Sequence, residues 1–374
     1  MTVRVNKQPF NVREKLSELE RPVGVKGHEL MRAETAQEAR DLVSAGRKNM
    51  VINGDMRISQ RVGTTATTIT SGGFVIDRYR CEDNTAGSTT HQQVTDAPPG
   101  FHNSLKVTVT GTDTTVDAGD FHYFRHIIEG NNINHLNWGS SNAKTVTLSF
   151  WVKSSVTGDH GGSLWNNAFN RSFPFNYKIS SADTWEYKSI TVPGCPDGTW
   201  ESGTARGINI GFVQNVGSTY QGPPGQWNSA GDVGPTNHVN LTATNGATWY
   251  ITGIQLEVGR NATDFEHRSY GEELALCKRY YQKIGDTATN EITLGGYSVS
   301  GSTIYHSIQL PVEMRVVPTL TQVGSLYSVR TGQPGSLSGH RGRKGFGVSH
   351  VTTGDGNYLL ASNANAYFVL DAEL

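Results

Sequence analysis

Histidines and acidic residues that could bind a metal ion or move protons gather between residues 91 and 135. They are His91, His102, His122, His126 and His135, with Asp113, Asp117 and Asp120 among them. Residues 120–128 read as a β-strand, in which His122 and His126 share a face but lie roughly 13 Å apart. Because one small ion cannot bridge that distance without ligands from other strands, we expect a polar strand face, with no metal site and no cofactor.

Carboxylates for glycoside hydrolysis are a second candidate set. Such a site needs two acidic groups about 5–10 Å apart across a cleft. The candidates in the central part of the chain are Asp159, Asp183, Glu186 and Glu201. Their surroundings are typical of solvated loops, and the sequence has no Walker A, HExxH, GxSxG or strand-linked GxGxxG motif. We therefore expect no catalytic residues and no enzyme.

A basic, glycine-rich stretch at residues 339–347 could bind an anion through Arg341, Arg343 and Lys344. A phosphate-binding loop joins a strand to a helix, and this stretch lacks that context. The pattern favours an exposed loop, with a subunit contact as one use for it.

The aromatic residues are the more informative group. Carbohydrate-binding sandwiches place Trp or Tyr rings against the weakly apolar C–H faces of sugars. Trp151, Trp185 and Trp249 lie in strand-like runs, which favours packing in the core or between sheets. In loops rich in Asn, Gly, Ser and Pro, a large ring has less structural reason to be. The aromatic residues in such loops are Trp165, Trp200, Tyr220 and Trp227. They are the candidates for glycan contact by at least one ring; loop anchoring or burial at an oligomer interface is the alternative reading of the same residues.

Composition indicates the elements that must position these residues. The chain has 374 residues, 43 of them Gly, and only 17% are charged, which is typical of short strands joined by tight turns. The net charge of -1 gives no field that would attract nucleic acid. Three distant cysteines, Cys81, Cys195 and Cys277, predict reduced thiols. No signal peptide and no membrane-spanning run is visible, so we expect folding in a cytoplasm without membrane insertion.

Residues 1–48 differ from the rest, with 10 Lys/Arg and 7 Asp/Glu. Capping-box patterns at residues 11–14 and 35–38 predict two short helices. Their apolar residues are Val12, Leu16 and Leu19 in the first and Leu42 and Val43 in the second. Stripes this narrow cannot build a core alone, so we expect a helical arm that packs on other virion proteins or on another subunit. Packing on the chain's own β-domain is the alternative.

Residues 49–268 alternate as strands do. In residues 146–152, Val146, Leu148, Phe150 and Val152 face one way and Trp151 faces the other. Residues 105–109, 208–212 and 248–258 repeat the pattern, so we expect a jelly-roll β-sandwich.

A linking helix is expected over residues 269–285, where a capping box opens at Ser269 and Gly285 follows the last turn. Leu274, Cys277 and Tyr281 would share its buried face. Residues 286–374 read as a second, smaller β-domain, a C-terminal tip. The fold class is therefore mainly β.

Several runs carry a family resemblance. They are residues 49–61, 76–79, 94–100, 149–154, 247–259 and 265–281, beginning NMVINGDMRISQR and ending FEHRSYGEELALCKRYY. Together they resemble a family of β-sandwich structural proteins of tailed bacteriophages, and residues 5–19 resemble N-terminal arms of marine and cyanobacterial phage proteins. The resemblance implies a tail-fibre-type virion protein with a carbohydrate-binding-like jelly roll, a homotrimer, and no catalytic residues.

We therefore predict a non-enzymatic virion protein, made in the host cytoplasm, that is anchored by its N-terminal arm and contacts host-surface polysaccharide. One alternative is a capsid decoration, head-fibre or tail-adaptor protein without a receptor role. A glycan depolymerase and a free bacterial lectin domain are the remaining alternatives.

Overall fold

The computed structural model describes Arg32 and residues 48–69, 71–286, 288–299 and 302–374. The predicted helical arm, with Val12, Leu16, Leu19, Leu42 and Val43, lies outside the described residues. Among the residues that are described, no helix is long and apolar enough to cross a bilayer. The described chain is mainly β, as the composition predicted.

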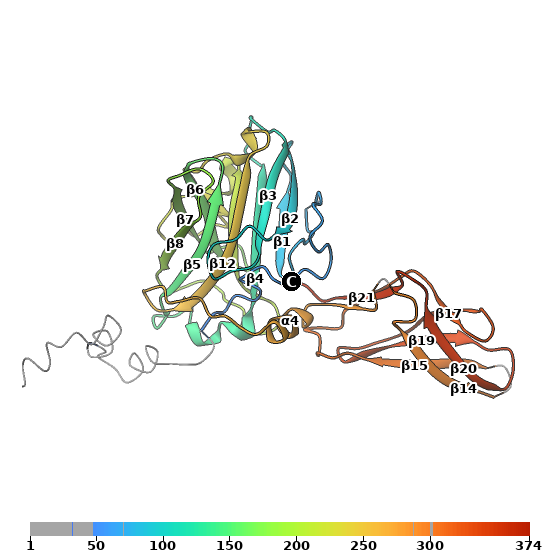
Figure 1. Ribbon diagram of the computed structural model, residues 1–374. Coiled ribbons are helices and arrows are strands. Elements are labelled where there is room, and N and C mark those ends of the chain that lie inside the picture. Colours follow the sequence, from blue (N-terminus) through green and yellow to red (C-terminus); the bar gives the residue numbers. More distant parts are fainter. Residues whose placement is uncertain (1–31, 33–47, 70, 287, 300–301) are drawn as a thin grey trace, which may run out of the picture. The chain divides into compact units, whose positions relative to one another are not determined.

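Two antiparallel five-stranded sheets form the central sandwich (Figure 1). The first has the order β1 (Tyr79–Asp83), β4 (Phe121–Glu129), β9 (Arg206–Val216), β6 (Gly158–Asn166), β7 (Ser172–Ile179). The second has the order β2 (Ser88–Val94), β3 (Ser104–Gly111), β12 (Thr248–Val258), β5 (Val146–Ser154), β8 (Glu186–Val192). Strands β1 and β2 are therefore edge strands, one in each sheet.

Short elements complete this part of the chain. The strands β10 (Gln221–Gly222) and β11 (Gly234–Pro235) form a parallel pair. Four single-turn 3-10 helices lie in the connections: Gly130–Asn132, Asn134–Leu136, Ser218–Tyr220 and Leu241–Ala243.

Alternating side chains build the core between the two sheets. Val146, Leu148, Phe150 and Val152 are fully buried, while Trp151 between them is half-buried on the opposite face, as the alternation predicted. The Phe150 ring packs edge-on against Phe212 of the facing sheet, with centroids 5.0 Å apart.

Residues 49–61, where the family resemblance begins, make structural contacts. The backbone N–H of Asn53 donates to Glu273 Oε1 at 2.6 Å, and its side-chain amide donates to the carbonyls of Ile58 and Asp77. Asn53 is fully buried and has a φ of 60°, a conformation that Asn tolerates better than most residues. Residues 49–61 therefore hold the sandwich to the helix that follows it.

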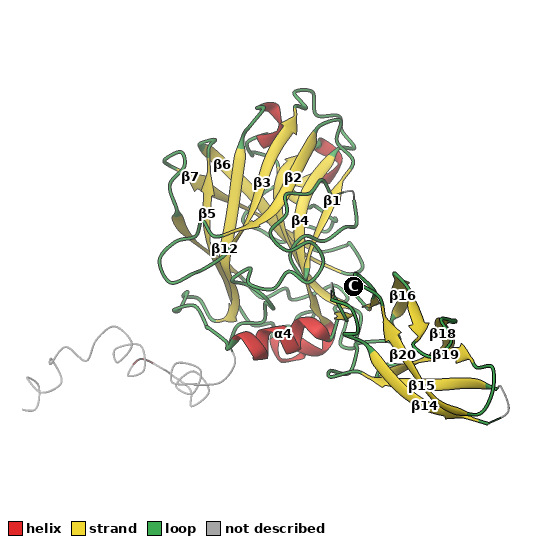
Figure 2. Cartoon of the chain, turned by 45° about the vertical axis from the view of Figure 1, so that its right-hand side comes forward, coloured by secondary structure: helices red, strands yellow, loops and turns green. Residues whose placement is uncertain are grey.

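That helix is α4 (Tyr270–Lys278), shown in red in Figure 2. Ser269 is its N-cap and accepts a hydrogen bond from the Glu272 N–H, as the capping box predicted. The helix ends earlier than the expected residue 285, because residues from Tyr281 onward form a strand instead. Cys277 is buried and Leu274 half-buried, but Tyr281 is not on the helix.

The C-terminal β-domain contains two sheets. Strand β13 (Tyr281–Ile284) pairs with β21 (Tyr367–Asp371), which pairs with β16 (Thr319–Val323). The six-stranded sheet has the order β14 (Thr293–Ser298), β20 (Gly356–Ser362), β17 (Leu326–Ser328), β18 (Pro334–Arg341), β19 (Gly345–Val351), β15 (Thr303–Gln309). Phe346, Phe368 and Leu370 belong to a core separate from that of the sandwich.

The residues after β21 return to the sandwich. Leu374 packs in a cluster with Ile127 and Cys277, and Glu373 forms ion pairs with Arg61 and the buried Arg78. Arg78 also donates to the Ile127 carbonyl at 2.6 Å, and its guanidinium lies 3.4 Å from the Tyr280 ring centre. These contacts join the last described residues to strand β1 and helix α4.

Candidate functional site

The outer face of the sheet β2-β3-β12-β5-β8 carries aromatic rings in register. Trp151 on β5 lies between Thr252 of β12 and Tyr187 of β8. Its ring centroid is 5.4 Å from that of Tyr187, whose side chain is 45% exposed. The inner residues of these strands are core residues, so the strands hold the outer rings in fixed positions. Two neighbouring aromatic rings on a solvent-facing sheet make this face a candidate binding surface.

Two loops make this surface into a groove of about 530 Å³, which we call the aromatic groove. Phe101, from the β2–β3 connection, packs edge-on against Phe265, from the β12–α4 connection, with centroids 5.0 Å apart. The lining includes Phe101, Ser149, Trp151, Tyr187, Gly253, Thr263, Asp264, Phe265 and His267. A volume of this size is in the range of about 300–1,000 Å³ that small-molecule sites occupy.

Gly253 shapes the floor of the aromatic groove. It lies in a bulge of β12, where the register with β5 shifts between Thr252 and Gln255. Its φ is 64°, and a Cβ there would lie 2.7 Å from the Phe101 ring and 3.2 Å from the Trp151 ring. Glycine at this position therefore allows both rings to rest on the backbone.

A charged and aromatic row lies next to the groove. Lys153 pairs with Tyr250 across β5 and β12, and its ammonium lies 4.2 Å from the Tyr250 ring centre and 5.3 Å from that of Trp185. Asp96 accepts hydrogen bonds from Lys153 and from the Trp185 indole N–H. Burial works against the charged form, but these two hydrogen bonds outweigh it and lower the pKa of Asp96.

The carboxylates do not form a hydrolytic pair in the groove. Asp264 is the one carboxylate among its lining residues in the part of the chain that the structure describes, whereas glycoside hydrolysis uses two. Of the sequence candidates, Asp159 and Asp183 are exposed, and Glu201 lies near Asn167. The Glu186 carboxylate accepts hydrogen bonds from the backbone N–H groups of Ser180 and Ser181 and from the Lys188 ammonium.

The four loop aromatics lie elsewhere. Trp165 is fully buried on β6, so its expected place in a glycan-contacting loop is wrong. Tyr220 is half-buried and packs edge-on against Phe121. Both belong to a small cluster with Val213, Val216 and Val233. Packing against apolar neighbours explains these two rings.

Trp200 and Trp227 come together with Trp138, which the sequence did not single out. The three centroids lie 4.7–5.7 Å apart. Each indole N–H donates to a backbone carbonyl: Trp138 to Lys144, Trp200 to Asp197 and Trp227 to Pro193. The three tryptophans thus hold three loops in contact with one another. Glycan contact by Trp200 and Trp227 stays a prediction.

The basic loop at residues 339–347 is part of the hairpin between β18 and β19 and lines an open groove of about 960 Å³ in the C-terminal β-domain. Arg343 and Lys344 face Glu313 at 2.9 and 3.7 Å, which neutralises part of their charge. Tyr305, 67% accessible, lies beside them, and its ring centroid is 6.3 Å from that of the exposed His340. These two rings are set among exposed basic side chains, whereas the rings of the aromatic groove pack on the backbone of a sheet.

Residues 120–128 were predicted as a strand, and Phe121–Glu129 form β4. His122 and His126 both lie on it and are fully buried, whereas His102 and His135 are exposed and lie outside the strands. The sequence placed His91 among the candidates, but it paired only His122 with His126 and left out Cys81. The alternation of polar and apolar residues does not show which strand of one sheet faces which strand of the other.

The two outer tryptophans had different outcomes. Trp185 was expected in the core or between sheets, but it is half-buried beside Lys153 and Tyr250. For Trp151 the same expectation of core packing was wrong, whereas its alternation with core residues correctly predicted the outer face. Phe101 and Phe265 carry no sequence signal, because loops far apart in the chain bring them together.

Comparisons with known proteins give structural similarity only. No protein-family model and no curated protein matches the chain. The enzymatically active domain of tailspike protein 4 of bacteriophage CBA120 is 14% identical over 56% of this chain and 21% of that chain, with a TM-score of 0.29. This chain thus spans about a fifth of the tailspike chain.

Two carbohydrate-binding structures are also similar. The family 11 module from Clostridium thermocellum, in complex with a β-1,3-1,4-mixed-linked tetrasaccharide, is 13% identical over 55% of this chain and 100% of that chain, with a TM-score of 0.26. A tandem of carbohydrate-binding modules from Paenibacillus barcinonensis is 9% identical over 84% of this chain and 98% of that chain, with a TM-score of 0.27. At these identities and scores the likenesses assign no function.

Proposed function

We propose that this chain is a non-enzymatic structural protein of a phage virion, of the tail-fibre type, whose sandwich binds host-surface glycan in the aromatic groove. The observation that carries the glycan proposal is the pair Trp151 and Tyr187, held in register on adjacent strands and open to solvent. The virion role is supported by the family resemblance of residues 49–281.

The groove has the chemistry that a sugar needs. The ring faces of Trp151 and Tyr187 suit the C–H faces of a pyranose. Ser149, Thr263 and Asp264 supply hydrogen-bonding groups for its hydroxyls. With one carboxylate in the lining, the groove is suited to binding rather than to cleavage.

Glycan-array screening of the purified chain, followed by titration with the best oligosaccharide, tests the groove. We expect Trp151→Ala and Tyr187→Ala to weaken binding by about 10-fold or more, since a central aromatic anchor contributes roughly 2 kcal/mol. Trp200→Ala tests the rival location at the loop tryptophans, and it should bind as the wild type does if the sugar lies in the aromatic groove. Loss of binding in Trp200→Ala with retention in Trp151→Ala would instead place the sugar at the loop tryptophans.

The role in the particle needs separate experiments. Imaging of the whole virion should locate the chain on the tail. A position on the capsid, together with no binding to any permissive host, would favour the decoration or adaptor alternative. Release of reducing ends from host glycan would contradict the non-enzymatic proposal.

A further inference from the structure

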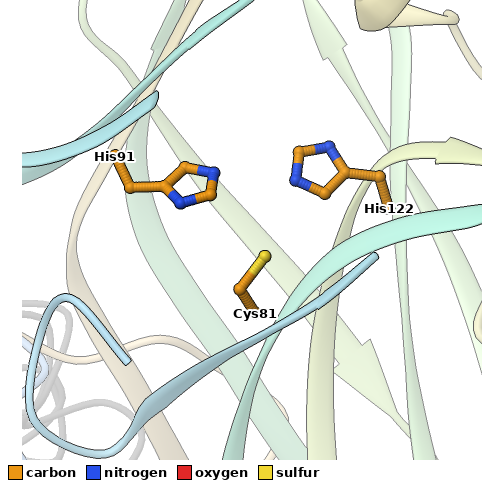
Figure 3. A group of neighbouring side chains, drawn as sticks. All are labelled: Cys81, His91 and His122. Carbon is orange, nitrogen blue, oxygen red and sulfur yellow. The ribbon is translucent and has the colours of Figure 1, made fainter. Parts of the chain in front are cut away.

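Three side chains with metal-ligating atoms meet inside the sandwich, on the edge strands and their neighbour. Cys81 of β1, His91 of β2 and His122 of β4 are each fully buried. One possible ligand atom from each lies within 4.8 Å of the others. Figure 3 shows the two imidazole rings pointing toward one another with the Cys81 sulfur directed at the space between them.

Strand register explains this convergence. Cys81 pairs with Phe124 and Asp83 pairs with His122 across β1 and β4, so Cys81 and His122 are diagonal neighbours on one face of that sheet. His91 reaches them from the facing sheet. The three groups therefore span both sheets.

The polar atoms of this cluster are incompletely satisfied. The Thr89 hydroxyl lies 2.8 Å from His91 Nε2 and 3.3 Å from His122 Nε2. The hydroxyl can donate to one Nε2 and accept from the Nε2–H of the other histidine, which leaves the two Nδ1 atoms to be accounted for. Nδ1 of His91 and Nδ1 of His122 are buried with no hydrogen-bond partner among the described residues. Such unpaired buried groups cost about 1–3 kcal/mol each, so a purely structural hydrogen-bond network is a poor account of this cluster.

We propose that Cys81, His91 and His122 bind one transition-metal ion, with Zn²⁺ as the ion that suits one thiolate and two imidazoles best. Zinc sites use Cys and His ligands in a tetrahedral arrangement. Thr89, whose hydroxyl lies beside both Nε2 atoms, is placed to contribute the fourth ligand as an oxygen. Binding would release the thiol proton of Cys81 to solvent and leave a Zn–S bond.

The protonation states of the histidines agree with this assignment, whereas burial raises the pKa of the Cys81 thiol, so that the ion itself would have to displace its proton. Burial, and then the neighbouring His122, lowers the pKa of His91 to about 3. Burial also lowers the pKa of His122. Both rings are therefore neutral at physiological pH, which is the form that binds metals.

The role of the ion would be structural. All three ligands are inaccessible to solvent, so no open coordination position faces a substrate. The backbone of His91 exchanges hydrogen bonds with Thr67, and that of Cys81 with Gly72 and Gly73. Thr67 is therefore bonded to one ligand strand and Gly72 and Gly73 to the other, and the ion would fasten these two edge strands to each other.

Metal binding is measured on the full chain, unfolded with chelator and refolded with and without one equivalent of Zn²⁺ or Co²⁺. We expect one zinc per chain by mass spectrometry, a higher thermal midpoint with zinc, and a thiolate-to-cobalt charge-transfer band. Failure of the wild-type chain to take up either ion, or a cobalt complex without the thiolate band, would overturn the proposal even if no variant folds.

Two pairs of variants locate the ligands. Cys81→Ser and His122→Asn should weaken zinc binding by at least about 100-fold, since loss of even an outer-shell partner costs about 10–100-fold. Cys277→Ser and His126→Asn are matched controls, because these residues are equally buried and His126 lies on the same strand. Equal zinc affinity in Cys81→Ser and Cys277→Ser would rule out the site.

Discussion

Arg78 is a charged side chain that is almost completely buried. Its partner Glu373 is likewise buried, and the Tyr280 ring covers the guanidinium. Breaking a buried ion pair costs about 3–5 kcal/mol, and the lower end of that range, about 3 kcal/mol, applies here because Glu373 keeps Arg61 as a partner at 3.2 Å. We expect Arg78→Met to lower the free energy of unfolding in urea by that amount.

The matched control is Arg171→Met. Arg171 binds Asp197 at 2.7 Å, but the Asp197 side chain is 60% exposed, and exposed pairs contribute about 0–1 kcal/mol. Equal losses of stability in the two variants would show that the pair at Arg78 is not the buried link inferred from the structure.

His126 makes the stability depend on pH. Burial, then the cations Arg78 and Arg268, lowers its pKa well below the usual value, although a hydrogen bond with Ile52 acts in the opposite direction. In the unfolded chain His titrates near pH 6.5. Below that pH the His126 imidazole is protonated in the unfolded state but stays neutral in the folded state. The free energy of unfolding therefore falls as pH falls.

Urea unfolding between pH 8 and pH 5 checks this sign. The wild type should lose stability across this range, and His126→Asn should lose less, because the titrating group is gone. The other buried histidines stay in both proteins, so the difference in slope belongs to His126. Parallel slopes would contradict the assignment.

At the scale of elements, the β12 bulge controls the aromatic groove. An Ala at 253 needs a positive φ and places its Cβ against the Phe101 and Trp151 rings. We expect Gly253→Ala to weaken glycan binding several-fold in titration and to cost about 1–2 kcal/mol of stability from the left-handed backbone.

Gly225→Ala separates these two effects. Gly225 also has a positive φ, 81°, but a Cβ there meets nothing within 4 Å. The Gly225→Ala variant should lose about as much stability as Gly253→Ala and should bind glycan as the wild type does. If both variants bind equally well, the bulge does not shape the site.

Element prediction from sequence succeeded where local pattern and tertiary packing agree. Alternation identified β5 and the outward direction of Trp151, and the capping box identified the start of α4. The helix end was missed, since Tyr281–Ile284 gains more by pairing with β21, a partner far along the chain. Trp165 was misplaced because its Asn- and Gly-rich neighbours resemble a loop while the residue itself lies on a strand.

The candidate sites were less predictable than the strands. Cys81, His91 and His122 come from three strands in two sheets, and the facing of those strands depends on the whole topology. The wall of the aromatic groove depends on Phe101 and Phe265, which are distant in sequence. No local sequence pattern predicts that the three metal-ligating side chains, or the two phenylalanine rings, come into contact.

At the scale of the whole molecule, assembly is the property that the arm and the resemblance predict. We expect light scattering of the full chain to give a trimer; a stable monomer would contradict the fibre-type proposal. Removal of residues 1–47 should leave a folded sandwich that no longer joins particles. The cut precedes Lys48 because its backbone N–H donates to Glu266 and its ammonium to Thr263. Continued assembly of the truncated chain would show that the anchor lies elsewhere.

The ion pair between Arg78 and Glu373 cannot form until late in synthesis, because its two residues are 295 positions apart in the chain. A ribosome adding about 5–20 residues per second makes the second member roughly 15–60 s after the first. Until then the nascent sandwich holds a guanidinium without its counter-charge and an apolar patch without Leu374. A chain broken off within the C-terminal β-domain would keep that defect. The sandwich therefore gains its full set of contacts only after the whole C-terminal β-domain has been translated.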